Sequence, residues 1–380
     1  MVDELKTGDW ETNIEYLNEF GKALLNWHNT QNNRQMPWKG EPDPYKIWLS
    51  EVILQQTRVE QGLPYYLRFV ETFPKVQDLA AAPDEVVFKL WEGLGYYSRC
   101  RNLLQTARLV AGEYGGKFPD NYAGLLKLKG IGPYTAAAIA SFAHNEPCAV
   151  TDGNVIRVLS RYHGIETAFD TTPGKKLFAM LAQLSLQNHP PAIYNQAIMD
   201  FGAMVCKPKL PACGICPLCS TCRAYALQMQ ANLPVKANRI EKKHRFFAFY
   251  IMVWQQQVLV RQRLGNDIWR GLFVFDFEEL PDSGTLKKLS AKKIVQHKHW
   301  DNPQALPPSG VFLQTLTHQH IHARFFEFHF SAQPNGLPAD SRWVNQQEFE
   351  EIAFPRVIRT YLAERMKILN KFFAFNLAKL

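Results

Sequence analysis

The segment of residues 125–157 places the strongest constraint on how this chain can fold. Two glycines, Gly130 and Gly132, flank a single isoleucine between two short stretches of helical character. Glycine permits the tight backbone of such a junction, and Pro133 suits the first turn of a helix, where its missing N–H has no partner to lose. The unpaired N–H groups at that helix N-terminus can hold a phosphate oxygen. The pattern predicts a phosphate-binding helical hairpin over residues 125–143, although an ordinary tight turn shares it.

Asp152 lies a short loop beyond the small-residue helix that we expect over residues 136–143. In one interpretation its carboxylate stands beside the phosphate site and takes part in chemistry. In the other it is the N-cap of the helix containing Val155, because aspartate is a preferred N-cap residue. The residues alone are compatible with both.

Cysteine usage points to a metal or cluster site. The chain has 7 cysteines, an odd number, and five of them lie between residues 206 and 222, which a disulfide framework explains poorly. Four thiolates at such spacings can hold an iron–sulfur cluster or a zinc ion. The spacing alone does not decide which four bind, because the run C-x2-C-x2-C-x2-C competes with a set that starts earlier. The five cysteines are Cys206, Cys213, Cys216, Cys219 and Cys222.

Glu51 is the single carboxylate in the apolar run IWLSEVILQQTRV, residues 47–59. A carboxyl group in such surroundings either pairs with a cation or has its pKa raised toward neutrality, and a raised pKa makes it a proton donor. A partly exposed helix glutamate has the same periodicity, so the residue pattern leaves this alternative open.

The chain divides into two regions by pattern. Helical periodicity dominates residues 1–229, residues 230–244 lack apolar periodicity and carry a charge run, and short strands separated by turns fill residues 245–368, before a tail at 369–380. The excess of 43 basic over 35 acidic residues suits a polyanionic partner. Since we find no signal peptide and no apolar run of membrane-spanning length, we expect a cytoplasmic, nucleoid-associated protein that does not contact membranes.

Several of these motifs resemble one known family. The segments KLKGIGPYTA (127–136) and TDGNVIR (151–157) are similar to the helix-hairpin-helix and catalytic-aspartate segments of the endonuclease III superfamily of DNA glycosylases. The segment SEVILQQT (50–57) resembles the adenine DNA glycosylases of MutY type. The later strands resemble their Nudix-like C-terminal domain, without the glutamate-rich signature of active Nudix hydrolases. The resemblance implies two domains, an all-α helix-hairpin-helix glycosylase domain with an iron-sulfur loop and a Nudix-like α/β recognition domain.

The resemblance also implies roles for individual residues. Glu51 would donate a proton to adenine, and Asp152 would stabilise or trap the sugar cation. Tyr134 would support the reaction by hydrogen bonding, and Asn154 would position Asp152 or the water. The residues implied to contact DNA or the flipped base are Arg34, Trp38, Gln55, Gln56, Thr57, Leu94, Tyr96, Gly130, Gly132, Gln196, Thr317 and His318.

In the family, the loop at Thr317 and His318 reads Phe-Ser-His, whereas this chain has Leu316-Thr317-His318. The hydroxyl is kept and an aromatic ring is lost. The family pattern assigns a [4Fe-4S] cluster to Cys206, Cys213, Cys216 and Cys222 and leaves Cys219 spare. A metal site at His318, His320 and His322 is an alternative to a DNA-facing edge, which we favour there.

The implied activity is monofunctional excision of adenine mispaired with 8-oxoguanine or guanine in double-stranded DNA, by a monomer. Two alternatives remain. An endonuclease III-type glycosylase-lyase for oxidised pyrimidines needs a hairpin lysine where this chain has Tyr134, and Lys129 precedes the turn instead. A non-catalytic iron–sulfur DNA-binding protein would have no use for the pair Glu51 and Asp152.

Overall fold

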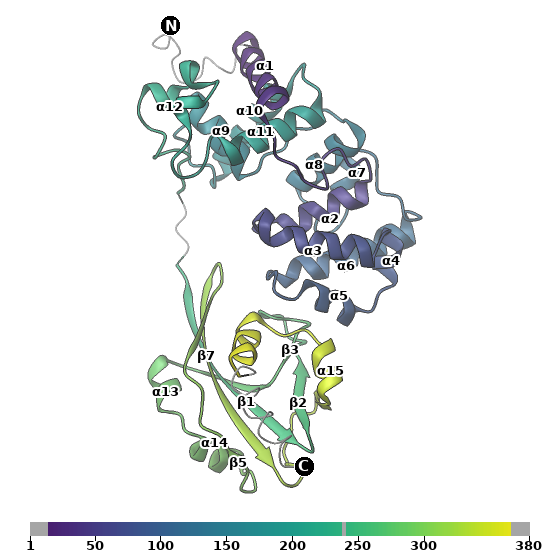
Figure 1. The fold of residues 1–380 in the computed structure, drawn as a ribbon, viewed down its shortest axis with the longest axis vertical. Coiled ribbons are helices and arrows are strands. Elements are labelled where there is room, and N and C mark those ends of the chain that lie inside the picture. The colour runs from purple at the N-terminus through teal and green to yellow at the C-terminus, as the bar shows by residue number, and fades with distance from the viewer. Residues whose placement is uncertain (1–13, 238–240, 366–380) are drawn as a thin grey trace. The chain divides into compact units, whose positions relative to one another are not determined.

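The computed structural model describes residues 14–237 and 241–365, and it divides by internal packing into two units. The first unit comprises residues 14–81 and 102–237, and the second comprises 82–101 and 241–365. Figure 1 shows helices in the first and a twisted sheet with flanking helices in the second. No helix within these ranges is long and apolar enough to cross a bilayer.

Helices make up the N-terminal half of the chain. They are α1 (Ile14–Gln31), α2 (Pro44–Leu54), α3 (Val59–Thr72), α4 (Val76–Ala81), α5 (Asp84–Trp91), α6 (Tyr97–Glu113), α7 (Tyr122–Leu125), α8 (Pro133–His144), α9 (Gly153–His163), α10 (Thr172–Leu186), α11 (Pro191–Met204) and α12 (Arg223–Ala226), with the short 3-10 helices η2 (Cys213–Ile215) and η3 (Cys219–Thr221).

One hydrophobic core joins α1, α9, α10 and α11 in the first unit. Its members include Phe20, Leu24, Leu159, Phe178 and Phe201, all of them buried. Helix α2 is buried around most of its circumference and packs against α8, which explains why its sequence is so uniformly apolar. The core fixes α8, α9 and α11 relative to one another, and α2 is held to them through its packing on α8.

The predicted hairpin is present in the first unit. Gly130 has a φ of +81°, and a side chain there would meet Asn102, so glycine is required on both counts. Gly132 is the N-cap of α8, and Pro133 occupies the first turn as expected. Thr106 donates a hydrogen bond to the carbonyl oxygen of Lys129, which ties the turn to α6.

The second unit contains eight strands. They are β1 (Lys243–Trp254), β2 (Gln257–Gln262), β3 (Phe273–Val274), β4 (Asp276–Leu280), β5 (Gln304–Ala305), β6 (Phe312–Thr315), β7 (Gln319–Phe330) and β8 (Ser341–Val344), with the helices α13 (Ser283–Lys288), α14 (Ala291–Lys298) and α15 (Gln346–Glu351). A further helix runs from residue 356 to the end of the described range. The strands expected from the sequence are confirmed.

The long strands β1 and β7 pair in parallel and form the centre of the sheet, with Phe249 opposite Phe325. The other pairings are antiparallel. They join β1 to β2 and β4, β2 to β3 and β8, and β7 to β5 and β6. Alternate residues of β1 and β7 pack against α13 and α14 on one face, with Trp300 at the edge of that core. This mixed sheet with helices is the α/β second domain that the sequence predicts.

The segment 82–101, which contains α5, packs with the sheet in the second unit. The carboxylate of Glu92 accepts hydrogen bonds from the Phe354 amide at 2.7 Å and from Arg359 Nη2 at 2.6 Å. Lys89 Nζ donates to the carbonyl oxygen of Ile352 at 3.1 Å. Residues 82–101 come from within the helical part of the sequence, so the chain contributes to the second unit twice.

Candidate active site

A cavity of about 480 Å³ in the first unit brings together ten of the sixteen residues that the sequence implicates in catalysis or in contacts to DNA or the flipped base. This volume lies in the range of small-molecule pockets. The predicted residues that line it are Arg34, Trp38, Glu51, Gln55, Gln56, Thr57, Tyr134, Asp152, Asn154 and Gln196. A second cavity of about 280 Å³ shares Arg34, Trp38, Glu51 and Gln196 with it.

Glu51 is 6% exposed and lies in the last turn of α2. Burial raises the pKa of its carboxyl group to about 7; a hydrogen bond from Tyr134 opposes this shift, and the negative charge of Asp152 adds to it. The partly exposed alternative is therefore wrong for this side chain. Near neutral pH this group can carry a proton to a bound molecule.

Tyr134 stands in the first turn of α8, directly after the glycine hairpin, and its hydroxyl is hydrogen-bonded to Glu51. Burial and the two neighbouring carboxylates raise its own pKa well above the usual value, so it stays a neutral phenol. The hairpin thus delivers a hydrogen-bond donor to the carboxyl group of another helix. Lysine is absent from the described residues that line this larger cavity, and Lys129 is exposed.

Asp152 is the N-cap of α9, which confirms one interpretation of its sequence position. It also lines the cavity, so its predicted role in chemistry is not excluded by the N-cap role and stays a prediction. Its Oδ1 accepts hydrogen bonds from the backbone amides of Asn154 and Val155, each at 2.8 Å. Its Oδ2 accepts one from Asn154 Nδ2 at 2.7 Å. Burial raises the pKa of Asp152, against the effect of these hydrogen bonds.

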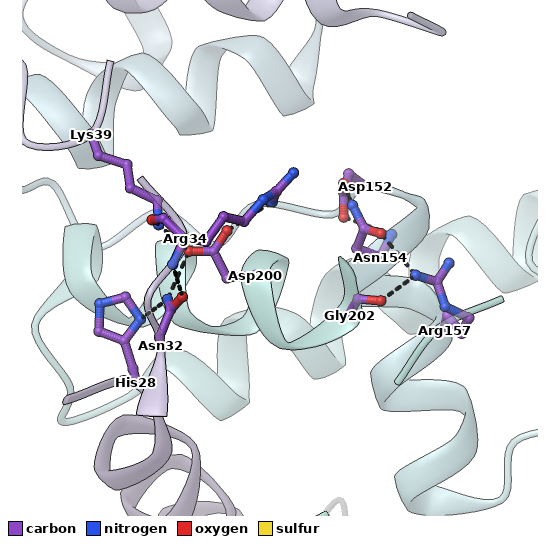
Figure 2. Close-up of polar contacts among 9 residues, drawn as sticks. All are labelled: His28, Asn32, Arg34, Lys39, Asp152, Asn154, Arg157, Asp200 and Gly202. Carbon is purple, nitrogen blue, oxygen red and sulfur yellow. Dashed lines mark hydrogen bonds and ion pairs between the residues drawn. The ribbon is translucent and has the colours of Figure 1, made fainter. Parts of the chain in front are cut away.

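Arg157, which was not among the residues predicted from the sequence, fixes Asn154, the residue that donates to the Asp152 carboxylate. Its Nη2 donates to Asn154 Oδ1 at 2.8 Å and to the carbonyl oxygen of Gly202 at 2.7 Å (Figure 2). Its Nε donates to the carbonyl oxygen of Cys206 at 2.7 Å. A polar chain therefore runs from α11 and the cysteine loop through Arg157 and Asn154 to Asp152. The sequence signal for this role is an arginine about one helical turn after Asn154 on the helix that Asp152 caps.

The turn after α2 places Gln55, Gln56 and Thr57 at the cavity. Gln56 has a φ of +56°, a backbone conformation that non-glycine residues seldom adopt and that often marks a functional segment. Gln55 Nε2 donates to Thr135 Oγ1 at 3.4 Å. Trp38 packs edge-on against Tyr66, with ring centroids 5.1 Å apart. Gln196 lines the cavity, whereas its neighbour Asn195 is buried and hydrogen-bonded to the backbone of Val150 and Cys148.

Four predicted residues lie in the second unit. Leu94 is buried between Gly93 and Gly95, both of positive φ, whereas Tyr96, which follows Gly95, is 43% exposed and has a φ of +49°. Thr317 and His318 form the bend between β6 and β7, closed by a hydrogen bond of 2.8 Å from the Leu316 amide to the carbonyl oxygen of Gln319. Within this unit the hydroxyl groups of Tyr96 and Thr317 are hydrogen-bonded to each other.

The histidines near this bend face one another. His320 is hydrogen-bonded to Thr315, and His322 Nε2 lies 2.9 Å from His244 Nδ1. In the part of the chain that the structure describes, no group of three or more histidine, cysteine, aspartate or glutamate side chains is arranged to hold a single metal ion. The metal alternative for His318, His320 and His322 is therefore not supported.

The five cysteines of residues 206–222 line one cavity with Arg161 and Tyr225. Each C-x2-C spacing closes a tight turn, with the amides of Cys216, Cys219 and Cys222 donating to the carbonyl oxygens of Cys213, Cys216 and Cys219 at 3.2, 3.1 and 3.3 Å. Arg161 Nη1 approaches Cys206 Sγ at 3.5 Å and fixes the start of the loop through the Lys207 carbonyl oxygen at 2.7 Å.

This donor set is compatible with the thiolate ligands of an iron–sulfur cluster. The four irons of a [4Fe-4S] cluster each take one thiolate, so the thiols must surround a space. The five cysteines line one cavity, which is compatible with that requirement. All of them are free thiols rather than disulfides.

Comparison with known proteins adds independent evidence. The family model described as HhH-GPD superfamily base excision DNA repair protein matches residues 49–182, and the NUDIX domain model matches residues 248–364. The chain is 40% identical to the adenine DNA glycosylase of Mus musculus, covering 90% of this chain and 78% of that protein. It is 30% identical to the adenine DNA glycosylase of Buchnera aphidicola (Schizaphis graminum), covering 90% and 97%. A solved thermostable thymine-DNA glycosylase superposes with a TM-score of 0.52 at 28% identity, covering 57% of this chain and 99% of that one.

Proposed function

Because this chain belongs to the adenine DNA glycosylases, base excision repair enzymes of the MutY type, we propose that it is a monofunctional glycosylase acting on adenine paired with 8-oxoguanine or guanine in double-stranded DNA. The observation that carries the proposal is the pair of carboxyl groups, Glu51 and Asp152, on one base-sized cavity. Adenine inside a duplex cannot reach buried groups, so the nucleotide must leave the stack and enter this cavity.

Glu51 is the proton donor in this proposal. Its carboxyl group, buried and hydrogen-bonded to Tyr134, carries a proton at neutral pH and delivers it to a ring nitrogen of adenine. The protonated base is a better leaving group, and the N-glycosidic bond breaks with its electron pair moving to the base. Trp38, Arg34 and Gln196 line the space that the base would occupy.

Asp152 acts on the sugar side. Two backbone amides and Asn154 hold its carboxylate in one orientation, where negative charge stabilises the oxocarbenium-like sugar or traps it as an ester. Water then adds to the anomeric carbon, and its proton returns to the carboxylates. Cleavage of a glycosidic bond generally requires one carboxyl group that donates a proton and a second that acts as a carboxylate. Glu51 and Asp152 would take these two roles.

We also propose that Cys206, Cys213, Cys216 and Cys222 hold a [4Fe-4S] cluster. When bound, the cluster supplies a covalent cross-link of the loop rather than a reacting group. The loop carries Lys207 and Lys209 and is tied to α9 by Arg157 and Arg161. These lysines suit contacts to DNA phosphates. Residues 1–229 would form the glycosylase domain, although 82–101 pack within the second unit. Residues 230–244 would be the linker and 245–368 the recognition domain of a monomer acting on chromosomal DNA.

The proposed function is tested with duplexes that contain adenine opposite 8-oxoguanine, guanine or thymine, and thymine glycol opposite adenine. We expect excision of adenine from the first two and none from the others, with strands uncut until alkali is added. Because Tyr134 stands where a lyase has lysine, borohydride should trap little enzyme on the product DNA.

Release of thymine glycol, together with borohydride trapping at a hairpin lysine, would instead indicate the lyase. Binding without excision of any base would indicate a non-catalytic protein. Wild-type enzyme on a fully matched duplex is the control for non-specific excision.

The bend of Thr317 and His318 is our proposed reader of the oxidised guanine. The double variant Thr317→Ala/His318→Ala should still excise adenine, but its preference for 8-oxoguanine over guanine opposite the adenine should narrow about ten- to a hundredfold, the worth of a pair of base contacts. The preference is measured as a ratio of single-turnover rates at one salt concentration, since phosphate contacts make affinity salt-dependent.

The variant Thr360→Ala is the matched control, because the hydroxyl group of Thr360 donates within its own helix, to the Arg356 carbonyl oxygen at 2.9 Å. An unchanged preference ratio in the double variant would place lesion reading elsewhere.

A further inference from the structure

A buried charge cluster adjoins the base cavity, and the proposed reaction does not use its central member. Asp200, on α11, is 0% exposed. Its Oδ1 accepts from Arg34 Nη1 at 2.8 Å, and its Oδ2 is 2.6 Å from Lys39 Nζ and 2.9 Å from Asn32 Nδ2 (Figure 2). The three donors all come from the segment that connects α1 to α2.

The carboxylate of Asp200 is held in its charged form. Burial by itself would raise its pKa, but hydrogen bonds from Lys39, Asn32 and Arg34 outweigh burial and lower it. A buried charge is tolerated only when it is paired and hydrogen-bonded, and this one meets both conditions. Removal of the carboxylate would leave two cations without their partner.

The donors, but not Asp200 itself, line the cavity of about 280 Å³ that Glu51 and Trp38 also line. Gln196, one helical turn earlier on α11, lines the same space. Lys39 also donates to the carbonyl oxygen of Arg34, which fixes the two cationic residues to each other. Asn32 adds a hydrogen bond of 2.9 Å to His28 Nδ1. Asp200 therefore sets the position of the cavity wall without reaching a bound base.

We propose that Asp200 is a positioning residue for the excised base: it fixes Arg34 and Lys39 at the cavity of about 280 Å³ that Glu51 also lines, and it offsets one of their two positive charges. This inference rests on the proposed adenine excision. This offset matters because a further uncompensated positive charge at the cavity that Glu51 lines would favour the ionised form of Glu51 and weaken it as a proton donor. The titratable and charged side chains around the two cavities are His28, Arg34, Lys39, Glu41, Glu51, Tyr134 and Asp152.

The variant Asp200→Asn keeps the shape of the side chain and removes its charge. In full-length enzyme we expect the single-turnover rate of adenine excision to fall about ten- to a hundredfold, as misplacement of positioning groups commonly does. Affinity for duplex DNA with an abasic site opposite 8-oxoguanine should stay within about twofold of wild type, because that product has no base to position. The descending limb of the pH–rate profile should move to lower pH.

A double-mutant cycle with Arg34→Gln separates positioning from general damage. If Asp200 acts through Arg34, the two changes are not additive, and Asp200→Asn costs less in the Arg34→Gln background. Lys39→Met tests the same cluster without altering the buried carboxylate, which matters if Asp200→Asn fails to fold. It should also slow excision and leave abasic-site affinity unchanged.

Asp170→Asn is the matched control, since Asp170 is in the same unit, accepts from the Ala237 amide at 2.9 Å, and is not among the cavity-lining residues. Equal kinetics and pH profiles for Asp200→Asn and Asp170→Asn would overturn the inference, as would a parallel loss of abasic-site affinity, additive effects in the cycle, or wild-type excision by Lys39→Met. A wild-type enzyme that excises no adenine would instead contradict the proposed function, and this inference with it.

Discussion

The variant Glu51→Gln is expected to bind mispaired DNA as tightly as wild type and to lose adenine excision by several orders of magnitude. Glutamine preserves the shape of the side chain and its hydrogen bond with Tyr134 but has no proton to give at neutral pH. Single-turnover excision and equilibrium binding, measured on the same duplex, separate the two effects. Excision at a near-normal rate would remove Glu51 from the mechanism.

The same substitution predicts a dependence of stability on pH. A glutamic acid in the unfolded chain loses its proton near pH 4.5, and Glu51 in the folded protein loses it near pH 7. Between these values the folded state binds the extra proton, so wild-type stability falls as pH rises through the window and stays lower above it. The variant Glu51→Gln has no such proton to lose. We therefore expect its free energy of unfolding at pH 8 to exceed that of wild type by on the order of 3 kcal/mol.

The difference in unfolding free energy between Glu51→Gln and wild type should vanish near pH 4, where the Glu51 side chain is neutral in the folded and in the unfolded chain. Chemical denaturation at the two pH values measures it. A constant difference across the range would show that Glu51 does not titrate in this window.

Serine substitution of the cluster ligands is the second change with a large expected effect. Purified wild-type protein should be yellow-brown with broad absorbance near ~400 nm from iron bound by four thiolates. Cys206→Ser, Cys213→Ser, Cys216→Ser and Cys222→Ser should each lose or weaken that absorbance and yield less folded protein, because the binding energy of a structural metal contributes to folding.

Cys219→Ser should keep the colour, as should Cys148→Ser, a control outside the cysteine loop. Cys219 lines the same cavity as the other four, so this comparison decides the ligand set. Bleaching by Cys219→Ser with colour retained by Cys206→Ser would assign the evenly spaced run as the ligands.

Local patterns predicted the elements of this fold well, because each carries its own signal. The glycine pair and Pro133 predict the hairpin, the period of apolar residues changes at the linker, and the strands beyond it are rich in aromatic and β-branched residues. Glu51 could be singled out because a lone carboxylate in an apolar run needs an explanation. Its burial is what the structure adds.

Tertiary partners could not be predicted in the same way. Asp200 also stands alone in an apolar helix, but the partners that distinguish it, Arg34 and Lys39, come from a distant segment. No local pattern pairs Glu92 with Arg359 either, so the packing of residues 82–101 within the second unit could not be predicted. Neighbouring residues on a helix differ too: Asn195 is in the core and Gln196 lines the cavity.

Helix α11 serves both sides of the cavity at once, through Asp200 toward Arg34 and through the Gly202 carbonyl oxygen toward Arg157. Each added or deleted residue turns the following part of a helix by about 100°. An insertion or deletion between Gln196 and Gly202 would rotate the following residues about the helix axis, so that Gln196, Asp200 and Gly202 could not all keep their present directions. A substitution alters one contact at a time. Length variation among related sequences should therefore fall in the loops before Pro191 and after Met204, and α11 should diverge by substitution alone.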